Sequence, residues 1–326
     1  MNEYNLTMIA VTGANGFIGT NLLAALNRRG REDLIAVDRA HPPRYLRDVV
    51  VSEWVDANEF CDWLSQRGTT LEAVYHLGAF SSTSVTDRDA VWANNVGYTQ
   101  MLWRWCAQAA VPLVYASSAG TYGDGTLGFD DEIDPAVFQP LSLYAESKQS
   151  FDLWALGQDQ APPRWAGIKY FNVYGPYEQH KGPQASMAYH WFNQVRKTGV
   201  ARLFRSHRTS VADGQQQRDF VYVEDAVDAT IHLMQGAGVT NGLYNVGTGR
   251  SSSFADLARA VFAALGREPR LEYFDMPESL RAQYQYFTEA TTTKLRRSGY
   301  ASAFCGVEEA MRRYVGRLQG HVGALT

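Results

Sequence analysis

Tyr144 and Lys148 are the residues whose types and spacing best suit chemistry. They stand four residues apart in the segment Tyr144-Ala145-Glu146-Ser147-Lys148. Residues at this spacing share one face of a helix, so the Lys148 ammonium can approach the Tyr144 phenol. A nearby positive charge favours the phenolate and lowers the tyrosine pKa from about 10 toward neutrality. The pair therefore predicts a general base that takes a proton from an alcohol.

A serine pair, Ser117 and Ser118, follows an apolar run that reads as a strand. A serine hydroxyl at a strand end can hydrogen-bond the substrate oxygen on which the tyrosine acts, which polarises an alcohol or a ketone. A Tyr-x-x-x-Lys pattern also occurs by chance, and its plain alternative is a partly buried helical tyrosine. The serine pair, together with a glycine-rich turn earlier in the chain, makes catalysis the better interpretation.

That glycine-rich turn stands where a dinucleotide-binding fold needs it. It reads Thr12-Gly13-Ala14-Asn15-Gly16-Phe17-Ile18-Gly19 and leads into an amphipathic stretch. Gly13, Gly16 and Gly19 allow a tight turn, a close approach of backbone amides to a pyrophosphate, and packing of a helix on a strand. Asp38 ends the next apolar run, 19 residues after Gly19, close to the usual place of the ribose-binding acid. These features predict a nicotinamide dinucleotide cofactor.

Arg39 and Arg44 leave the choice between NAD and NADP open. An acid such as Asp38 normally accepts the 2′-hydroxyl of NAD, whereas an adjacent guanidinium can bind the 2′-phosphate of NADP. Because Arg39 could stack on the adenine and bind phosphate together, NADP is the favoured cofactor and NAD the alternative.

These residues require a scaffold of parallel strands, and the hydrophobic pattern predicts one. Short β-branched runs alternate with longer amphipathic stretches, which is typical of stacked βαβ units. The expected strands are 8–11, 34–37, 73–76, 113–116, 166–170, 220–223 and 243–246, and the expected helices include 21–29 and a long one at 87–110. The predicted fold class is α/β, a doubly wound parallel sheet (Rossmann type) with a smaller α/β C-terminal substrate domain.

The domain division is expected where this pattern loosens, just beyond Tyr170. We predict a dinucleotide-binding domain over residues 1–172 and a substrate domain over residues 173–326, with 220–247 packing back on the first domain. The polar stretch 205–218 predicts a solvated loop, with a lid or binding loop as the alternative.

The composition indicates a globular protein with a small ligand. Of the 326 residues 45% are hydrophobic, and 30 Lys+Arg against 34 Asp+Glu leave a net charge of −4. This balance gives no general attraction for nucleic acid or membrane surfaces, and no apolar run is long enough to span a bilayer. Three separated cysteines without zinc-ligand spacing predict free thiols and no metal. With a polar N-terminus unlike a signal peptide, they predict a cytoplasmic protein.

Further motifs make nearly the whole chain resemble the extended short-chain dehydrogenase/reductase family. These motifs are Asn94-Asn95-Val96, Tyr122-Gly123, Tyr170-Phe171-Asn172-Val173-Tyr174-Gly175-Pro176 and Arg218-Asp219-Phe220-Val221. More narrowly, His180-Lys181-Gly182 and Tyr284-Gln285-Tyr286-Phe287-Thr288 are similar to stretches of the nucleotide-sugar epimerases that act on ADP-heptose. This resemblance implies inversion of C6 of ADP-D-glycero-D-manno-heptose for lipopolysaccharide synthesis, with a tightly held NADP. We also expect a homo-oligomer.

The resemblance implies a role for each matching residue. Tyr144 and Lys181 are the two implied bases, Ser118 polarises the reacting oxygen, and Lys148 tunes the tyrosine and holds the nicotinamide ribose. Implied cofactor contacts are Gly13, Gly16, Phe17, Ile18, Gly19, Asp38, Arg39, Leu77, Gly78, Ala79, Asn94, Lys148, Val173 and Lys181. Implied substrate contacts are Ser81, Asn172, His190, Phe204, Arg218 and Tyr284.

Two departures from the family pattern concern the sugar contacts. The stretch between Phe204 and Arg218 is longer than expected, and Pro183-Gln184 replaces a Ser-Met pair. The alternatives are another nucleotide-sugar epimerase or reductase of the family and, from a different class, a non-catalytic dinucleotide sensor. The intact Tyr144 and Lys148 argue against the sensor, because a sensor does not need them.

Overall fold

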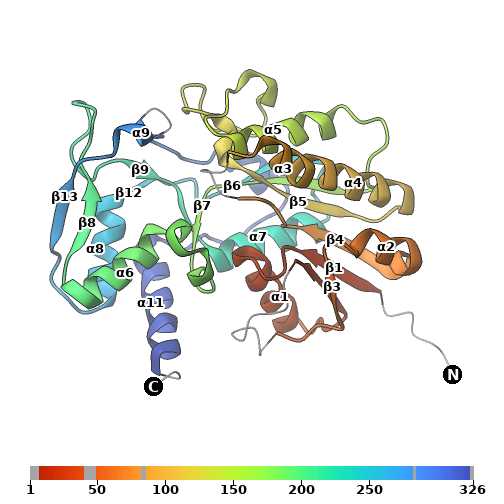
Figure 1. The fold of residues 1–326 in the computed structure, drawn as a ribbon, viewed down its shortest axis with the longest axis horizontal. Coiled ribbons are helices and arrows are strands. Elements are labelled where there is room, and N and C mark those ends of the chain that lie inside the picture. The colour runs from red at the N-terminus through yellow and green to blue at the C-terminus, as the bar shows by residue number, and fades with distance from the viewer. Residues whose placement is uncertain (1–6, 40–48, 82–85, 282–283, 324–326) are drawn as a thin grey trace.

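Seven parallel strands form the central sheet of the computed structural model, which describes residues 7–39, 49–81, 86–281 and 284–323 (Figure 1). Every neighbouring pair in this sheet is parallel. In spatial order the strands are β11 (Gly242–Val246), β6 (Trp165–Tyr170), β5 (Leu113–Ser118), β4 (Leu71–His76), β1 (Met8–Thr12), β2 (Leu34–Asp38) and β3 (Glu53–Asp56). The chain order reverses beside β1, so the predicted α/β, doubly wound sheet is confirmed.

Helices cover both faces of this sheet, because successive strand side chains point to opposite sides. Val11 and Ile168 belong to the core on one face, and Val74 and Leu113 to the core on the other. The covering helices are α1 (Phe17–Arg28) and α7 (Val223–Gln235) on the first face, and α2 (Phe60–Arg67), α4 (Tyr98–Ala109) and α5 (Leu143–Leu156) on the second. Figure 1 shows the two helix layers with the strands between them.

The long helix predicted at 87–110 contains a π-helical turn. It consists of α3 (Arg88–Trp92), the turn η3 (Ala93–Gly97) and α4. Within the turn, the Asn95 side chain donates to Ser147 Oγ (3.0 Å) and to the Phe80 carbonyl (3.1 Å). Ser147 in turn donates to the Tyr144 carbonyl (2.7 Å). The π turn therefore fastens α5, which carries Tyr144, to the loop after β4.

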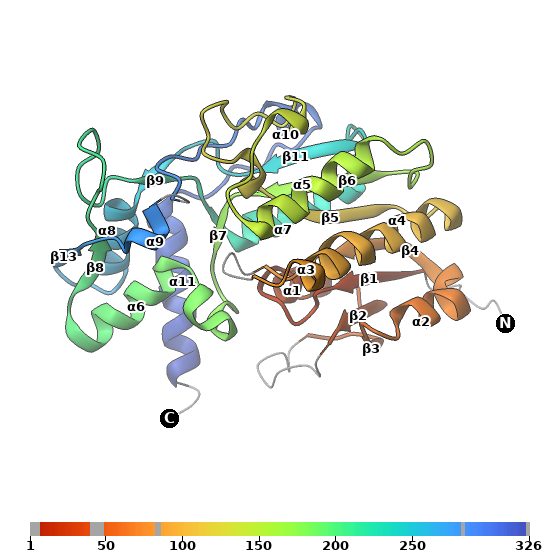
Figure 2. The ribbon, with the colours of Figure 1, turned by 45° about the horizontal axis from the view of Figure 1, so that its top comes forward.

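A second, smaller core lies beside the carboxyl ends of the strands (Figures 1 and 2). Its elements are α6 (Met187–Thr198), β8 (Ala201–Phe204), α8 (Phe254–Ala264), β13 (Leu271–Phe274) and α11 (Val307–Gly323). Shorter elements complete the chain: β7 (Asn172–Tyr174) pairs with β10 (Phe220–Tyr222), β9 (Gln217–Arg218) pairs with β12 (Ser252–Ser253), and α9 (Glu278–Arg281) and α10 (Thr293–Arg297) follow. The division of the chain after residue 172 stays a prediction.

Several boundaries differ from the predicted ones. The first helix begins at Phe17 instead of residue 21, because the glycine turn feeds directly into it. The strand predicted at 220–223 ends at Tyr222, and Val223 begins α7. From there the chain returns to the main sheet, where α7 contacts α1 and β11 pairs with β6.

The stretch 205–218, predicted as a solvated loop, is anchored at two places. The His207 amide donates to the Tyr286 hydroxyl (2.9 Å), and the Arg208 guanidinium lies 4.3 Å from the Tyr286 ring centroid. Its last two residues form β9. The loop prediction is therefore confirmed for 205–216, which contain no helix or strand, and wrong for 217–218, which form β9.

The three cysteines are free thiols, as expected. Among the residues described here, no helix is long and apolar enough to cross a membrane.

Candidate active site

A cavity of about 1000 Å³ lies at the carboxyl ends of β1, β2, β4 and β5. This is where ligands bind in doubly wound sheets, and the volume is at the upper end for a small-molecule site. The predicted site residues that line it are Gly13, Gly16, Phe17, Ile18, Gly19, Asp38, Arg39, Leu77, Gly78, Ala79, Ser81, Asn94, Ser118, Tyr144, Asn172, Val173 and Lys181. The fold thus gathers most of the predicted cofactor and catalytic residues around one space.

The glycine turn is closed too tightly for side chains. A Cβ on Gly13 would lie 2.6 Å from the Gly78 nitrogen, and one on Gly19 would lie 2.0 Å from the Gly13 carbonyl oxygen. Helix α1 begins directly after Gly16, and no side chain caps its first turn. Backbone N–H groups at such a helix start can bind an anion. The turn therefore fits the diphosphate of a dinucleotide.

His76, a residue that the sequence did not single out, hydrogen-bonds Thr12, which directly precedes the glycine turn. Its Nδ1 lies 2.6 Å from Thr12 Oγ1, and its Nε2 lies 2.9 Å from Thr99 Oγ1. The Thr99 hydroxyl donates to the Asn95 carbonyl (2.8 Å). Thr99 can therefore accept from His76 Nε2–H while Thr12 donates to Nδ1, which requires a neutral imidazole.

We expect the unfolding free energy to fall as the pH drops below about 6.5 because of His76. Burial, with a smaller effect of the Lys148 charge, lowers the pKa of His76 from 6.5 to about 3. Between these values the unfolded chain binds a proton that the folded protein does not bind. The expected slope is about 1.4 kcal/mol per pH unit.

The matched variant for this prediction is His76→Gln, whose amide can still bond both threonines but does not titrate. The variant isolates the effect of His76, because Asp131 acts in the opposite direction. Burial raises the pKa of Asp131 to about 6, so protonation of Asp131 stabilises the fold as the pH falls. Urea unfolding near about pH 7 and about pH 5 should show a larger loss in the wild type. Equal losses in both proteins would contradict the assignment.

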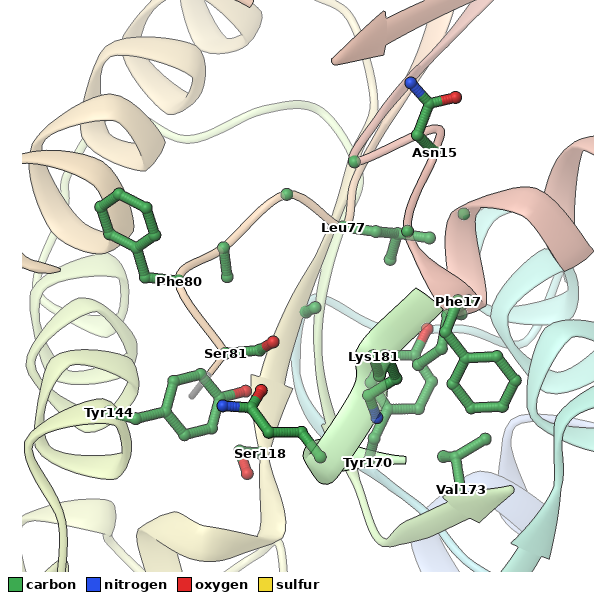
Figure 3. Close-up of a pocket in the computed structure, with 18 of the residues that line it drawn as sticks. Asn15, Phe17, Leu77, Phe80, Ser81, Ser118, Tyr144, Tyr170, Val173 and Lys181 are labelled. Atoms are coloured by element: carbon green, nitrogen blue, oxygen red, sulfur yellow. The ribbon is translucent and has the colours of Figure 1, made fainter. Parts of the chain in front are cut away.

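Tyr144 and Ser118 lie in contact in the lining of the cavity. Ser118 ends β5, where its hydroxyl accepts the Gly120 N–H (3.0 Å) and hydrogen-bonds the Tyr144 phenol. Ser142 caps the first turn of α5 and so fixes the start of the helix that presents Tyr144. Figure 3 shows the Tyr144 ring entering the pocket beside Ser81 and Ser118.

The pKa of Tyr144 differs from the predicted one. Burial raises the pKa of Tyr144 to about 12, and the hydrogen bond to Ser118 only partly opposes this. Lys148 Nζ lies 5.9 Å from the Tyr144 ring centroid, and burial lowers the pKa of this lysine to about 8. The predicted lowering of the tyrosine pKa by Lys148 is therefore wrong for this structure, since desolvation outweighs a charge at that distance.

Asp152 is a charged residue that the sequence pattern did not single out. It is fully buried, one helical turn after Lys148. Its carboxylate accepts from Ser117 Oγ (2.6 Å) and from the Tyr115 hydroxyl (3.0 Å), and it pairs with Lys169 Nζ (3.3 Å). The Asp152 charge opposes the effect of burial on the pKa of Lys148. Asp152 thus favours the charged form of Lys148. The sequence held one sign of this contact, because the four-residue spacing of Lys148 and Asp152 places them on the same face of a helix.

Lys181 enters the cavity from the side opposite Tyr144 (Figure 3). It lies in the short helical turn η6 (Gln179–Gln184), with its Nζ 5.3 Å from the Phe17 ring centroid. Burial lowers the pKa of Lys181, and the Glu178 carboxylate opposes this shift. A lysine whose charged form is disfavoured in this way gives up its proton more readily than an exposed lysine does.

Asp38 and Arg39 lie together at the end of β2. The Asp38 carboxylate accepts the Arg39 N–H (2.7 Å) and a further N–H from the glycine turn (2.8 Å). The Arg39 side chain donates to Asn94 Oδ1, and its guanidinium lies 4.7 Å from the Phe80 ring centroid. Phe80, which the sequence did not indicate, thus supports the arginine at the cavity rim. Arg44 lies outside the described residues.

Five predicted site residues lie outside the cavity lining, and three of them form a separate group. The Arg218 guanidinium lies 5.1 Å from the Tyr284 ring centroid and 5.6 Å from that of Phe254, which lines the cavity. The Phe204 and Tyr284 centroids are 6.4 Å apart. His190 lies apart, with a ring nitrogen 3.3 Å from a carbonyl of η6. The fifth, Lys148, is buried behind Tyr144.

Comparison with known proteins identifies the family. A model described as "NAD dependent epimerase/dehydratase family" matches residues 9–247. The chain belongs to this family. It is 42% identical over 322 residues to the ADP-L-glycero-D-manno-heptose-6-epimerase of Fusobacterium nucleatum, covering 94% of this chain and 97% of the relative. It is 43% identical to the enzyme of the same name from Nitratidesulfovibrio vulgaris, covering 97% and 100%. The resemblance inferred from the motifs is confirmed.

Solved structures of this family share the fold. The Helicobacter pylori ADP-L-glycero-D-manno-heptose-6-epimerase superposes with a TM-score of 0.80 at 22% identity, covering 97% of this chain and 98% of that one. The Thermus thermophilus UDP-glucose 4-epimerase, solved with NAD, gives a TM-score of 0.75 at 26% identity, covering 96% and 99%. The predicted nicotinamide dinucleotide cofactor agrees with the family description and with the shape of the glycine turn.

Proposed function

We propose that this protein inverts C6 of the heptose in ADP-D-glycero-D-manno-heptose to give ADP-L-glycero-D-manno-heptose. The observation that carries the proposal is the meeting of Tyr144, Ser118 and Lys181 in one cavity that also contains the glycine turn. The names of the relatives at 42% and 43% identity support the same substrate. We also expect the active protein to be a homo-oligomer.

Inversion at this carbon requires transient oxidation. A secondary alcohol carbon carries no acidic proton, so its configuration changes most readily through a ketone. When bound, the oxidised nicotinamide supplies a hydride acceptor, a hydride donor after the first half of the reaction, and a positive charge. The carbon loses a hydride and the oxygen a proton, and both are returned, so no net oxidation or reduction occurs.

The residues of this chain move the proton. Tyr144 Oη or Lys181 Nζ accepts it from the alcohol, and Ser118 donates a hydrogen bond to the same oxygen. The two groups enter from opposite sides of the cavity, so the ketone oxygen meets the second group after the ketone has turned (Figure 3). That group then returns a proton as the hydride reaches the other face of C6. Asp152 favours the charged form of Lys148, and that charge opposes, without outweighing, the burial that raises the pKa of Tyr144.

A substrate panel tests this function. ADP-D-glycero-D-manno-heptose should be converted, whereas UDP-glucose should not be converted to its 4-epimer at a comparable rate. UDP-glucose is the informative control because a UDP-glucose 4-epimerase shares the fold. Conversion of UDP-glucose alone would make this chain a hexose 4-epimerase.

We further propose that NADP is preferred over NAD, and that Arg39→Ala reduces this preference. The Arg39 guanidinium is exposed at the cavity rim and keeps donors beyond its bond to Asn94. A charge-assisted contact to the 2′-phosphate contributes roughly 1.5–3 kcal/mol, or about one to two powers of ten in dissociation constant. Titration of both cofactors into both proteins measures this, with NAD affinity as the internal control. Equal wild-type affinities would mean that Asp38 governs the site and that NAD is the natural cofactor.

A further inference from the structure

Glu178 is a fully buried carboxylate in the loop that carries Lys181. Four donors converge on its two oxygens. They are the Gly175 N–H (3.1 Å), the Ser186 N–H (2.5 Å), the Ser186 hydroxyl (2.7 Å) and the Tyr314 hydroxyl (2.8 Å). A carboxylate anion only accepts hydrogen bonds, so this set of donors suits its charged form.

The four donors come from three separate parts of the fold. Gly175 follows β7 directly, Ser186 caps the start of α6 by accepting the Tyr189 N–H (3.3 Å), and Tyr314 lies in α11, 136 residues after Glu178. Glu178 therefore joins both ends of the loop between β7 and α6 and ties the loop to the last helix.

The backbone of this loop needs such support. Tyr177, directly before Glu178, has a φ of +69°, which is unusual for a residue with a side chain. Gly182, directly after Lys181, has a φ of +53°, which glycine adopts without strain. Backbone in this region persists where surrounding contacts hold it in place. The bonds of Glu178 are contacts of that kind, three residues from Lys181.

The Glu178 charge also acts on Lys181. It raises the pKa of Lys181, in opposition to burial. His180 is a described titratable group near this lysine. Burial and the Lys181 charge lower the pKa of the His180 ring, whereas a backbone hydrogen bond at Tyr177 and the charges of Asp38 and Glu178 raise it. Helix α1 presents the uncharged ring of Phe17. Glu178 is thus the negative group that acts on the Lys181 ammonium.

We propose that Glu178 is the positioning residue of Lys181, and that it controls the half of the epimerisation in which Lys181 exchanges the proton. This inference rests on the proposed function, because it assigns Glu178 to one of two acid–base groups. It predicts that the loss of Glu178 affects the Lys181 half of the reaction and leaves the Tyr144 half nearly intact.

An aldehyde analogue of the heptose separates the two halves. Two aldehyde molecules and one water give one acid and one alcohol, so the hydride taken from the hydrated aldehyde is returned to the second molecule. In a Tyr144→Phe background this disproportionation depends on Lys181, and in a Lys181→Met background it depends on Tyr144. Glu178→Gln is introduced into each background, and rates are measured across a range of pH.

In the Tyr144→Phe background, we expect Glu178→Gln to lower the rate by about tenfold or more, the scale expected for a displaced catalytic group. The acidic limb of the pH profile should move to lower pH, because the removed charge no longer raises the pKa of Lys181. In the Lys181→Met background, the further loss should stay within about twofold, since the group that Glu178 positions is already absent.

Tyr314→Phe is the matched control, because it removes one of the four donors and keeps the charge. It should slow the Lys181-dependent background by a smaller factor, without moving the pH profile. Melting temperature and cofactor binding are recorded for every variant. If Glu178→Gln does not fold, the effect of Tyr314→Phe is compared between the Tyr144→Phe and Lys181→Met backgrounds instead. Equal losses in the two backgrounds, or no loss in either, would overturn the inference. A wild type that neither epimerises ADP-heptose nor disproportionates the aldehyde would instead contradict the proposed function.

Discussion

Tyr144→Phe should lower the rate of ADP-heptose epimerisation by at least about 10²-fold while leaving cofactor binding nearly unchanged. The substitution removes the one oxygen that exchanges a proton and that Ser118 hydrogen-bonds, while the ring keeps its place on α5. Burial raises the pKa of Tyr144 to about 12. A phenolate at Tyr144 would be favoured by positive charge nearby, which Lys148 provides and an oxidised nicotinamide would add when bound. The variant has no oxygen at this position to exchange the proton.

Epimerisation followed by NMR, together with cofactor titration, measures this effect. Tyr98→Phe is the matched control, because Tyr98 lines the same cavity but its hydroxyl donates to the Ala57 carbonyl (3.3 Å). The control should epimerise at close to the wild-type rate. A Tyr144→Phe enzyme that keeps more than half of the wild-type rate would remove Tyr144 from the mechanism.

Lys181→Met should also impair epimerisation severely, and the double variant Tyr144→Phe/Lys181→Met should lose all hydride chemistry. If the two groups act on opposite sides of the reacting carbon, each single variant keeps one of them. Each should then still disproportionate the aldehyde analogue slowly, with a loss of about 10²-fold or more at the affected step. The double variant has neither group and should be inactive.

Lys197→Met is the control for this series, because Lys197 is an exposed lysine in the last turn of α6. Its rate and melting temperature should match the wild type. Should Lys181→Met epimerise as fast as the wild type, the loop lysine is a surface charge and the protein uses one base.

The sequence predicted the parts of this site that local pattern determines. The turn Gly13–Gly19 could be recognised because tight backbone geometry requires glycine at stated positions, and the structure leaves no room for a Cβ at Gly13 or Gly19. Tyr144 and Lys148 could be recognised because helical spacing places them on one face. The alternation of strands and helices likewise predicted the parallel sheet.

The missed features depend on contacts between distant segments. In the sequence, Glu178 looks like an ordinary acidic residue. Only the fold shows that Tyr314, far along the chain, donates a hydrogen bond to it. Asp152 forms an ion pair with Lys169, which lies on β6. The pKa of Tyr144 follows from burial, which no spacing rule reports, and so its predicted direction was wrong. Residue type and spacing therefore identified the candidate catalytic residues, whereas their electrostatic environment could be known only from the fold.

In the proposed reaction, hydride leaves one carbon and returns to the same carbon within one active site. The most direct measurement is NMR of the product after incubating pure protein with ADP-D-glycero-D-manno-heptose and no added cofactor. We predict conversion to the L-glycero epimer by protein that carries its own cofactor, with no net oxidation or reduction. Accumulation of a ketone or a reduced sugar, or no conversion even after NADP and NAD are added, would contradict it.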